Sequence, residues 1–527
     1  MNRLVSRLQK LRAEFRPQLP NCLQNLLNIE FQLEEATGAV ANQEEIEKLF
    51  PKTFGRPMAL GKYGDPRKCE SLKVGVVFSG GQAAGGHNVI TGLFDALAVM
   101  NPQSKLIGFL GGPSGIVENK IVELTKEGIA PYRNQGGFDL IGSGRTKIET
   151  EEQLAASLNT VSDHGLDGLV IVGGDDSNTN AAILAEYFLD KGCSTVVVGV
   201  PKTIDGDLKN EWIATSFGFD TACKTYAEMI GNIERDALSA KKYWHFVKLM
   251  GRSASHITLE CALATHPNVT LIGEEVAEKG MTLDQITTEV AQVIRKRVEK
   301  GMHYGLVLVP EGLIEFIPEV KVLIGELNAL VAKGAGVEGL SGGAKHCYDA
   351  LPEEIQKQLL LDRDPHGNVQ VSKIETEKLL LSAVEKKLDE KFAAQSHFFG
   401  YEGRAGFPSQ FDTHYCYALG YTAALLVDEG LTGYMTSVGD LHKPIENWTA
   451  GGIPITMLMN MEERKGKEKP VIQKALVDLE GKAFSFFAEN RKKWAEEDHY
   501  RFPGPIQFFG ESEMVDGVPL TLQIECE

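Results

Sequence analysis

The chain has 527 residues, of which 43% are hydrophobic and 24% are charged, and its formal net charge at pH 7 is −18. This length exceeds one compact core and predicts two domains, while the negative charge makes nucleic acid and anionic membranes poor partners. No apolar run approaches the ~20 residues of a membrane span, and residues 1–15 lack the continuous apolar stretch of a secretory signal.

The eight cysteines are scattered along the chain, at positions 22, 69, 193, 223, 261, 347, 416 and 526. None forms a Cys-x-x-Cys pair, so the sequence indicates neither a zinc site nor a disulfide framework. Reduced thiols are the simplest interpretation, and we expect a cytoplasmic protein.

Residues 1–50 predict helices because Leu, Gln and Glu dominate there, and the Pro and Gly residues between 51 and 66 predict a loop. From residue 73 onward one pattern recurs: a short β-branched run, a Gly-rich or polar tail, and a helical stretch. It occurs at Lys73–Gly81, Gly168–Asp176, Thr195–Asp207, His245–Arg252 and Gly305–Gly312. This alternation predicts a parallel sheet with helices on both faces, in which ligands collect beyond the carboxyl ends of the strands.

The stretch from 319 to 395 is different, because its helical segments are highly charged. We expect it to be a mostly helical insertion. Strand-and-loop character returns at residues 396–411, and the tail after 465 is expected to be polar and helical before it becomes less regular.

The first polar tail, Phe78–Ile90, reads as a glycine turn between a strand and a helix. Glycine lets backbone N–H groups approach an anion closely. The spacing fits neither a P-loop nor a dinucleotide fingerprint, so a tight turn without a ligand remains an alternative at this point. Gly142–Arg145 is a second, weaker candidate for an anion contact.

Two adjacent carboxylates, Asp175 and Asp176, follow Gly173 and Gly174 just before a helix that is predicted to start near Ser177. Helix capping favours Asp at such a position. One carboxylate satisfies a cap, so the second is left for a metal ion.

The tail Pro201–Asp207 follows the next strand and contains Lys202, Thr203 and Asp205. An aspartate at a strand end can reach a hydroxyl proton as a general base. An Asx-type turn explains one aspartate, but not the lysine and the threonine beside it. Carboxylates, an ammonium group and glycines at neighbouring strand ends point to chemistry on a metal-bound phosphate.

Three further tails are uninformative when each is taken alone: Met250–Arg252, Pro310–Gly312 and Gly400–Arg404. Arginine can fork onto phosphate or sugar oxygens, but each segment also fits an exposed loop.

Taken together, the tails resemble the phosphofructokinase family. The resemblance spans about residues 73–455, and its motifs are Gly80-Gly81, Gly173–Ser177, Pro201–Asp207, Met250–Arg252, Pro310–Gly312 and Gly400–Arg404. The helical start and the insertion are similar to the long-chain branch that uses inorganic pyrophosphate. Ala84 stands where proline is expected, and this departure should not change the chemistry because the loop acts through backbone groups.

The resemblance implies two doubly wound three-layer α/β domains with parallel-rich sheets, together with the helical insertion and N-terminal helices. We expect residues 1–216 and 403–455 to form the larger domain, which binds pyrophosphate and Mg²⁺. Residues 217–402 and 456–527 are expected to form the second domain, which binds the sugar phosphate.

Two positions are expected to select the phosphoryl donor. Relatives that use ATP typically carry glycine where this chain has Asp176 and Lys202. A carboxylate at 176 would fill and charge the space that the α-phosphate of ATP needs, and Lys202 would neutralise charge on the transferred and leaving groups. The resemblance therefore implies a pyrophosphate donor.

The resemblance also implies individual roles. Gly81 contacts the diphosphate, Asp175 binds Mg²⁺, and Asp205 accepts the proton from the 1-hydroxyl of fructose 6-phosphate. The implied substrate contacts are Thr203, Ile204, Met250, Gly251, Arg252, Glu311, Tyr401, Glu402, Gly403 and Arg404. Lys242 and Tyr243 match positions that reach into the site of a neighbouring subunit, which implies a homodimer.

The implied reaction is a reversible in-line transfer that gives fructose 1,6-bisphosphate and phosphate, in glycolysis or gluconeogenesis. The alternatives are an ATP-dependent 6-phosphofructokinase, a non-catalytic regulatory subunit of the same fold, and a kinase for another acceptor. Asp176 and Lys202 argue against the first, and the intact Thr203-Ile204-Asp205 argues against the second. The Met250–Arg252 and Tyr401–Arg404 loops favour fructose 6-phosphate over another acceptor.

Overall fold

A computed structural model describes the chain except for residues 1–4, 362–368, 370–372, 389–391, 465–466 and 512–513. The chain divides into two compact units. The first unit consists of Met1–Ala222, Gly403–Ala475 and Gln507–Val518, and the second of Cys223–Glu402, Leu476–Ile506 and Pro519–Glu527.

The first unit takes in residues 456–475 and 507–518, which we expect in the second domain. Specific contacts account for this. The backbone N–H of Ile472 donates to Thr179 Oγ1 at 3.3 Å, and the ring of Phe508 packs edge-on against Phe15 with centroids 4.9 Å apart.

The first unit is built on one sheet with the strand order β1-β2-β13-β12-β7-β6-β3-β4-β5. The strands are β1 (Ile29–Ala36), β2 (Pro57–Tyr63), β3 (Lys73–Phe78), β4 (Lys105–Phe109), β5 (Ile121–Leu124), β6 (Gly168–Gly173), β7 (Val196–Pro201), β12 (Tyr434–Gly439) and β13 (Thr449–Pro454). The strands from β4 to β12 in this order are parallel, and the outer pairs are antiparallel. Every residue of β6 and β7 is buried, as in a parallel sheet covered on both faces.

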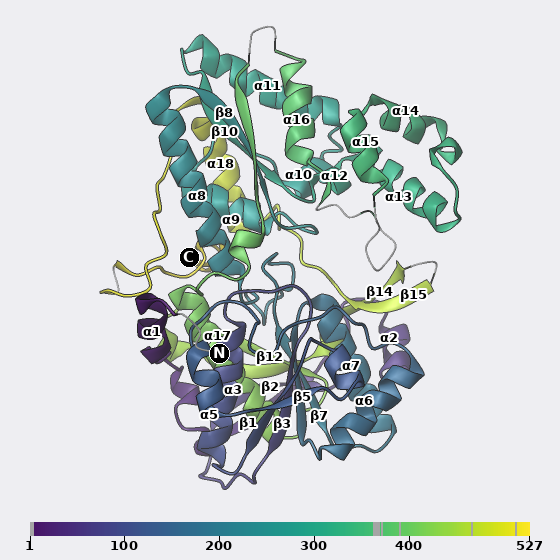
Figure 1. Ribbon diagram of the computed structural model, residues 1–527, viewed down its shortest axis with the longest axis vertical. Helices are drawn as coiled ribbons and strands as arrows, with labels where there is room; N and C mark the ends of the chain where they lie inside the picture. Colours follow the sequence, from purple (N-terminus) through teal and green to yellow (C-terminus); the bar gives the residue numbers. More distant parts are fainter. Residues whose placement is uncertain (1–4, 362–368, 370–372, 389–391, 465–466, 512–513) are drawn as a thin grey trace. The chain divides into compact units, whose positions relative to one another are not determined.

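Helices cover both faces of this sheet (Figure 1). Helices α6 and α7 pack with α2 on one face, where their apolar side chains join those of β3, β6 and β7 in one core. Helices α3 and α17 pack together on the other face. The helices of this unit are α1 (Arg7–Glu14), α2 (Gln43–Leu49), α3 (Gly86–Met100), α4 (Ser114–Val117), α5 (Lys126–Ile129), α6 (Glu151–Asp163), α7 (Asp175–Asp190) and α17 (Gln410–Asp428).

Two segments of this unit differ from the sequence prediction. The helix expected over residues 1–50 is interrupted by β1, which pairs with β2 inside the expected loop. The helix expected after 465 is preceded by a hairpin of β14 (Met459–Arg464) and β15 (Lys467–Ile472). Pairing with a distant or adjacent strand overrides the helical propensity of the Glu- and Lys-rich sequences at both places.

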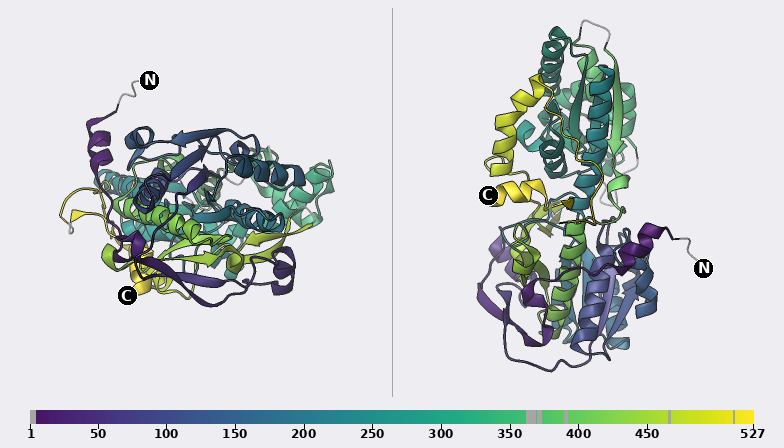
Figure 2. Two further views of the ribbon diagram at one scale, coloured as in Figure 1. Left: turned by 90° about the horizontal axis from the view of Figure 1, so that it is seen from below. Right: turned by 90° about the vertical axis from the view of Figure 1, so that its left-hand side faces the viewer.

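The second unit is built on a parallel sheet with the order β11-β8-β10-β9. Its strands are β8 (Tyr243–Leu249), β9 (Val269–Thr270), β10 (Tyr304–Pro310) and β11 (Ala394–Phe399). Helices α9 (His256–Thr265) and α18 (Lys482–Glu496) lie on one side of the sheet, and α11 (Leu283–Glu299) and α16 (Thr376–Glu385) lie on the other (Figure 2). The expected fold class, α/β with parallel-rich sheets between helical layers, is therefore confirmed in both units.

The remaining helices of the described chain are α8 (Phe219–Ala240), α9 (His256–Thr265), α10 (Gly273–Glu278), α11 (Leu283–Glu299), α12 (Leu313–Phe316), α13 (Pro318–Ala332), α14 (Gly342–Ala350), α15 (Glu353–Leu359), α16 (Thr376–Glu385), α18 (Lys482–Glu496) and α19 (Leu520–Cys526). Helices α13 to α16 form the described part of the expected insertion and share a core with α11. The insertion is therefore helical over these residues.

Candidate active site

The carboxylates Asp175 and Asp176 occupy the first two positions of α7. The helix begins at Asp175, two residues earlier than predicted, and its N-cap is Gly174, which makes no side-chain capping bond. Neither aspartate is therefore the N-cap residue. Both carboxylates lie in the first helical turn, where the helix dipole stabilises negative charge.

Close contacts fix the turn from β6 into α7. A Cβ on Gly173 would lie 2.3 Å from Cβ of Ser177, so glycine is required at that position. The hydroxyl of Ser177 donates to Ser79 Oγ at 2.8 Å, which ties the start of α7 to the turn after β3. The two strand ends thereby present their polar tails side by side.

The turn after β3 brings its backbone close to three cations. Gly80 has a φ of +88°, and a Cβ there would lie 3.3 Å from Lys202 Nζ. A Cβ on Gly81 would lie 3.5 Å from Arg404 Nη1 and 3.8 Å from Arg145 Nη2. The predicted diphosphate contact, Gly81, therefore lies among side chains suited to phosphate oxygens.

Lys202 reaches this turn from the end of β7 and is only 6% exposed. The pKa of Lys202 is lowered to about 8, chiefly by burial and also by the positive charges of Arg404 and Arg145, against the opposing negative charges of Asp205 and Asp175. The structure thus brings Lys202 close to Asp175 of the neighbouring tail and to Asp205 of its own tail. A buried amine between acids and guanidinium groups is well placed to meet a polyanion.

The loop after β7 orients Asp205 and buries Asp207. The backbone N–H of Asp205 donates to Thr203 Oγ1 at 3.1 Å, and Ile204 is 4% exposed. Burial, followed by the negative charges of Asp205 and Asp175, raises the pKa of Asp207 to about 7. The carboxylates of Asp205 and Asp175 therefore lie near enough to Asp207 for their charges to disfavour its ionised form.

Two further cations line this cluster, and the sequence reasoning did not find them. The ammonium group of Lys147 donates to Asp176 Oδ1 at 3.0 Å. The ammonium group of Lys474 lies 3.8 Å from Asp175 Oδ2. Lys474 is far from α7 in the chain and belongs to no recognisable motif, so only the fold reveals it.

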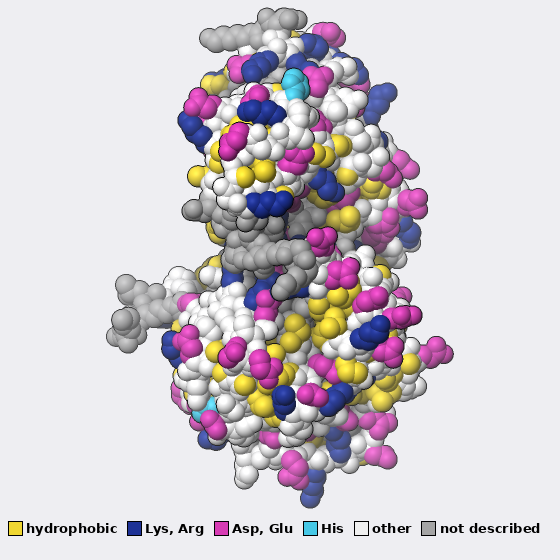
Figure 3. All heavy atoms as spheres, turned by 90° about the vertical axis from the view of Figure 1, so that its right-hand side faces the viewer, with side chains coloured by type: hydrophobic (Ala, Val, Ile, Leu, Met, Phe, Trp, Pro, Cys, Tyr) yellow, Lys and Arg dark blue, Asp and Glu magenta, His cyan; other side chains and the backbone are white. Residues whose placement is uncertain are grey.

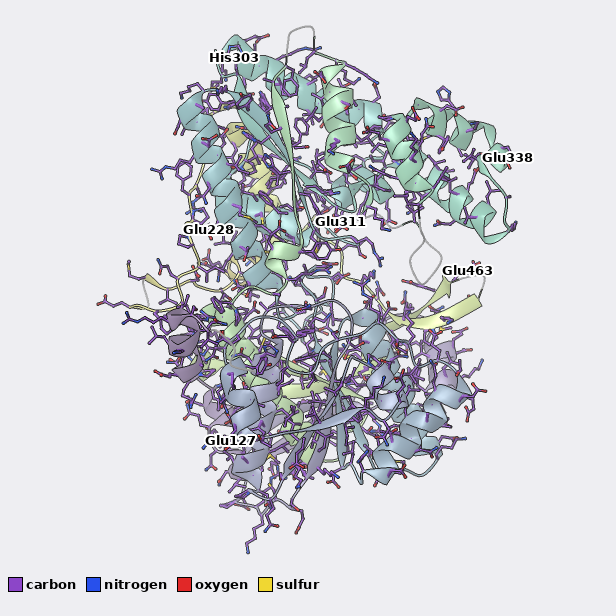
Figure 4. The ribbon with its side chains drawn as sticks, in the orientation of Figure 1. Glu127, Glu228, His303, Glu311, Glu338 and Glu463 are labelled. Carbon is purple, nitrogen blue, oxygen red and sulfur yellow. The ribbon has the colours of Figure 1, made fainter. Side chains whose placement is uncertain are left out.

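In the second unit, the expected sugar-phosphate residues lie on loops that follow adjacent strands. The backbone N–H of Gly251, after β8, donates to Glu311 Oε2 at 2.9 Å, and Glu311 follows β10 (Figure 4). A Cβ on Gly312 would lie 1.9 Å from the carbonyl oxygen of Arg252, so only glycine allows these two loops to pack. Glu311 is buried, and Arg252 is exposed.

The loop after β11 joins this group. The backbone N–H of Gly400 donates to Glu402 Oε2 at 2.7 Å, and a Cβ on Gly400 would lie 3.0 Å from Met250 Cε. Tyr401 is 69% exposed. Met250, Gly251, Arg252, Glu311, Tyr401 and Glu402 therefore lie on neighbouring loops of the second unit, whereas Gly403 and Arg404 belong to the first.

Lys242 and Tyr243 lie at the other end of β8. The Lys242 ammonium lies 4.9 Å from the centre of the Tyr243 ring, and β8 runs from Tyr243 to Leu249 before the Met250 loop begins. The length of the strand separates this pair from the Met250 loop by about 20 Å. The structure does not bring these two residues to the sugar-phosphate loops of their own unit.

Among the described residues, no group of three or more His, Cys, Asp or Glu side chains could hold a metal ion unaided. The carboxylate of Asp175 is 25% exposed, and its charge reaches Lys202, which lies beside the turn after β3. Mg²⁺ is commonly held by one or two carboxylates together with substrate phosphates and water. The residues present therefore fit a divalent ion that arrives with a polyphosphate.

On the face shown in Figure 3, acidic side chains are distributed over the surface with basic side chains among them. The cations around Gly81 are thus a local concentration in a chain of net charge −18. Among the described residues, no helix is both long enough and apolar enough to cross a membrane.

The chain is similar to known proteins over most of its length. The family model described as phosphofructokinase matches residues 73–427. The chain is 51% identical to a pyrophosphate–fructose 6-phosphate 1-phosphotransferase of Treponema pallidum, over 99% of this chain and 97% of that protein. It is 55% identical to subunit beta 2 of the Arabidopsis thaliana protein of that name, over 93% and 90% of the two chains. A crystal structure of a pyrophosphate-dependent phosphofructokinase from Nitrosospira multiformis shares the fold with a TM-score of 0.56 and 16% identity, covering 86% of this chain and 97% of that one.

Proposed function

The chain belongs to the phosphofructokinase family, and from this premise we infer that it is a pyrophosphate-dependent phosphotransferase. It transfers a phosphoryl group reversibly between pyrophosphate and the 1-hydroxyl of fructose 6-phosphate, which gives fructose 1,6-bisphosphate and phosphate. The observation that carries this function is identity at about half of all positions, over nearly the whole chain, to relatives named for that reaction.

Asp205 is the proposed general base. It lies at the carboxyl end of β7, in a loop held by the Thr203 hydroxyl, close enough to Lys202 for their charges to interact. Asp205 takes the proton of the 1-hydroxyl as that oxygen attacks the nearer phosphorus, and the bridging P–O bond breaks to release phosphate.

The diphosphate occupies the cationic turn in this proposal. The backbone of Gly81 and the side chain of Lys202 contact its oxygens, because Lys202 lies beside the turn that carries Gly81. Lys202 stabilises the charge that moves from the transferred to the leaving phosphate. Asp176 excludes ATP, because its carboxylate would fill the position of the α-phosphate and repel its negative charge.

Mg²⁺ is the proposed cofactor, with Asp175 as its protein ligand. The ion would neutralise charge on the diphosphate and help to orient it. Lys202 binds the anion, and Asp205 moves the proton.

The loops of the second unit are proposed to bind the sugar phosphate. Their residues include Arg252, which can fork onto phosphate oxygens, and Glu311, whose position is set by the Gly251 N–H. Thr203, Ile204, Gly403 and Arg404 are the proposed contacts from the first unit. Lys242 and Tyr243, at the far end of β8, suit a neighbouring copy better than their own, so we propose a homodimer in the cytoplasm.

One assay separates this function from its rivals. The purified chain is given Mg²⁺, fructose 6-phosphate, and either pyrophosphate or ATP as donor. We expect turnover of fructose 6-phosphate with pyrophosphate as the donor and none with ATP. Turnover with ATP alone would assign the ATP-dependent reaction, and no turnover with either donor would favour a regulatory subunit, although the intact Asp205 and Lys202 argue against that role.

A further inference from the structure

Residues 472–475, at the end of β15 and just after it, are hydrogen-bonded to α7 and to the loop after β7. The backbone N–H of Ile472 donates to Thr179 Oγ1 in the first turns of α7, and the Thr179 hydroxyl itself donates to the carbonyl of Asp175 at 3.0 Å. Three residues later, the backbone N–H of Ala475 donates to the carbonyl of Asp207 at 2.8 Å. These bonds hold residue 474 between the start of α7 and the loop after β7.

The side chain at this position is Lys474, whose ammonium group lies near the carboxylates of the donor site. Lys474 is 26% exposed, and its ammonium lies 3.8 Å from Asp175 Oδ2. Its charge also reaches Asp207, where it opposes the rise in pKa that burial and the two nearby carboxylates cause. At 3.8 Å the contact with Asp175 is electrostatic rather than a direct hydrogen bond. The carboxylate can therefore take a metal ion without first breaking such a bond.

The chemistry of the donor explains why another cation is needed here. Inorganic pyrophosphate has neither base nor sugar, so its affinity has to come from contacts to phosphoryl oxygens. Lys202 and Arg404 lie beside Gly80 and Gly81, whereas the ammonium of Lys474 lies beside Asp175 and its charge reaches Asp207.

We propose that Lys474 is a further pyrophosphate-binding residue, whose ammonium contacts a diphosphate oxygen on the Asp175 side of the donor site. The proposal rests on the proposed function, since it assigns a residue to the same donor site. It adds a binding group that comes from the C-terminal part of the chain and lies outside every motif of the family resemblance.

The test compares Lys474→Met and Lys474→Arg in the full chain with a matched control, Lys469→Met. Lys469 lies in β15, and its ammonium pairs with Glu149 at 3.0 Å, where both side chains are 41% exposed. A charged hydrogen bond lost to Met should raise KM for pyrophosphate about 10- to 100-fold and change KM for fructose 6-phosphate less than twofold. Lys474→Arg should restore most of the affinity, and Lys469→Met should leave it unchanged.

A second readout separates binding from support of the metal ligand. Calorimetry measures pyrophosphate binding to the full chain with Mg²⁺ and with a chelator, without any turnover. Direct contact predicts weaker binding by Lys474→Met under both conditions. A loss that occurs only with Mg²⁺ would mean that Lys474 acts through Asp175, and equal affinity in all variants would remove the residue from the site; either result overturns the proposal.

The design keeps two failures apart. If the unsubstituted chain does not turn over pyrophosphate with fructose 6-phosphate, the proposed function fails, whatever Lys474 does. If it does so and Lys474→Met behaves like Lys469→Met, the inference about Lys474 fails alone. Where Lys474→Met does not fold, Lys474→Gln with an unchanged thermal unfolding midpoint serves in its place.

Discussion

The ammonium of Lys147 lies 3.0 Å from Oδ1 of Asp176. This ion pair links the loop before α6 to the first turn of α7. The pair holds the carboxylate that we expect to select the donor. Its position is therefore set by a lysine as well as by the helix that carries it. This arrangement separates two questions: what the carboxylate excludes, and what keeps it in place.

Replacement of Asp176 tests the first question. Asp176→Gly should weaken pyrophosphate use and admit some ATP, because it removes both the volume and the charge at the α-phosphate position. Asp176→Asn keeps the volume and removes the charge. Specificity constants for both donors check this, and an unchanged donor preference in Asp176→Gly would contradict the role of Asp176.

Replacement of Lys147 tests the second question. Lys147→Met should lower kcat/KM for pyrophosphate by a few-fold, since partly exposed ion pairs of this kind contribute about 0.2–1 kcal/mol. The variant should still not use ATP, because the carboxylate of Asp176 remains. Lys469→Met, which breaks a surface ion pair, is the matched control. A gain of ATP turnover in Lys147→Met would show that the lysine itself excludes the nucleotide.

Removal of the proposed base should reduce the rate without reducing affinity. Asp205→Ala is expected to lose on the order of 10²–10⁴-fold in kcat, while the dissociation constants of pyrophosphate and fructose 6-phosphate stay within a few-fold. Single-turnover kinetics and calorimetry measure the two effects separately. Near-normal turnover of the variant would exclude Asp205 as the base.

The depressed pKa of Lys202 predicts a pH dependence. Burial brings this pKa down to about 8, so the ligand-free protein loses the ammonium charge as the pH rises through 8. The value of kcat/KM for pyrophosphate should then fall above pH 8 at saturating fructose 6-phosphate. Lys202→Arg keeps its charge over this range and should move the fall to higher pH. An identical profile in the variant would assign the fall to another group.

The strand-end motifs made much of this site predictable from the sequence. Gly81, Asp175, Lys202 and Asp205 follow buried β-branched strands, and parallel strands bring their carboxyl ends to one edge. Neither Lys147 nor Lys474 has such a signal, because each reaches the site through tertiary packing alone.

Secondary structure was least predictable where local composition and long-range pairing disagree. Ile29–Ala36 is rich in Glu and reads as helix, yet it pairs with β2 at the edge of the sheet. The same holds for Lys467–Ile472, which pairs with β14. An edge strand is exposed on one side and therefore lacks the apolar run that identifies a central strand.

The strand order of the first sheet affects how the chain can fold while it is being translated. The neighbour of β7 on one side is β12, which the ribosome makes only after residues 223–402 of the other unit. The edge of β7 thus stays open through the translation of the whole intervening segment, and during that time it is a site for pairing with another nascent chain. Arg404 and Lys474 also follow that segment, so a polypeptide that ends before residue 404 contains the proposed base Asp205 but lacks two of the cations proposed to bind the substrates.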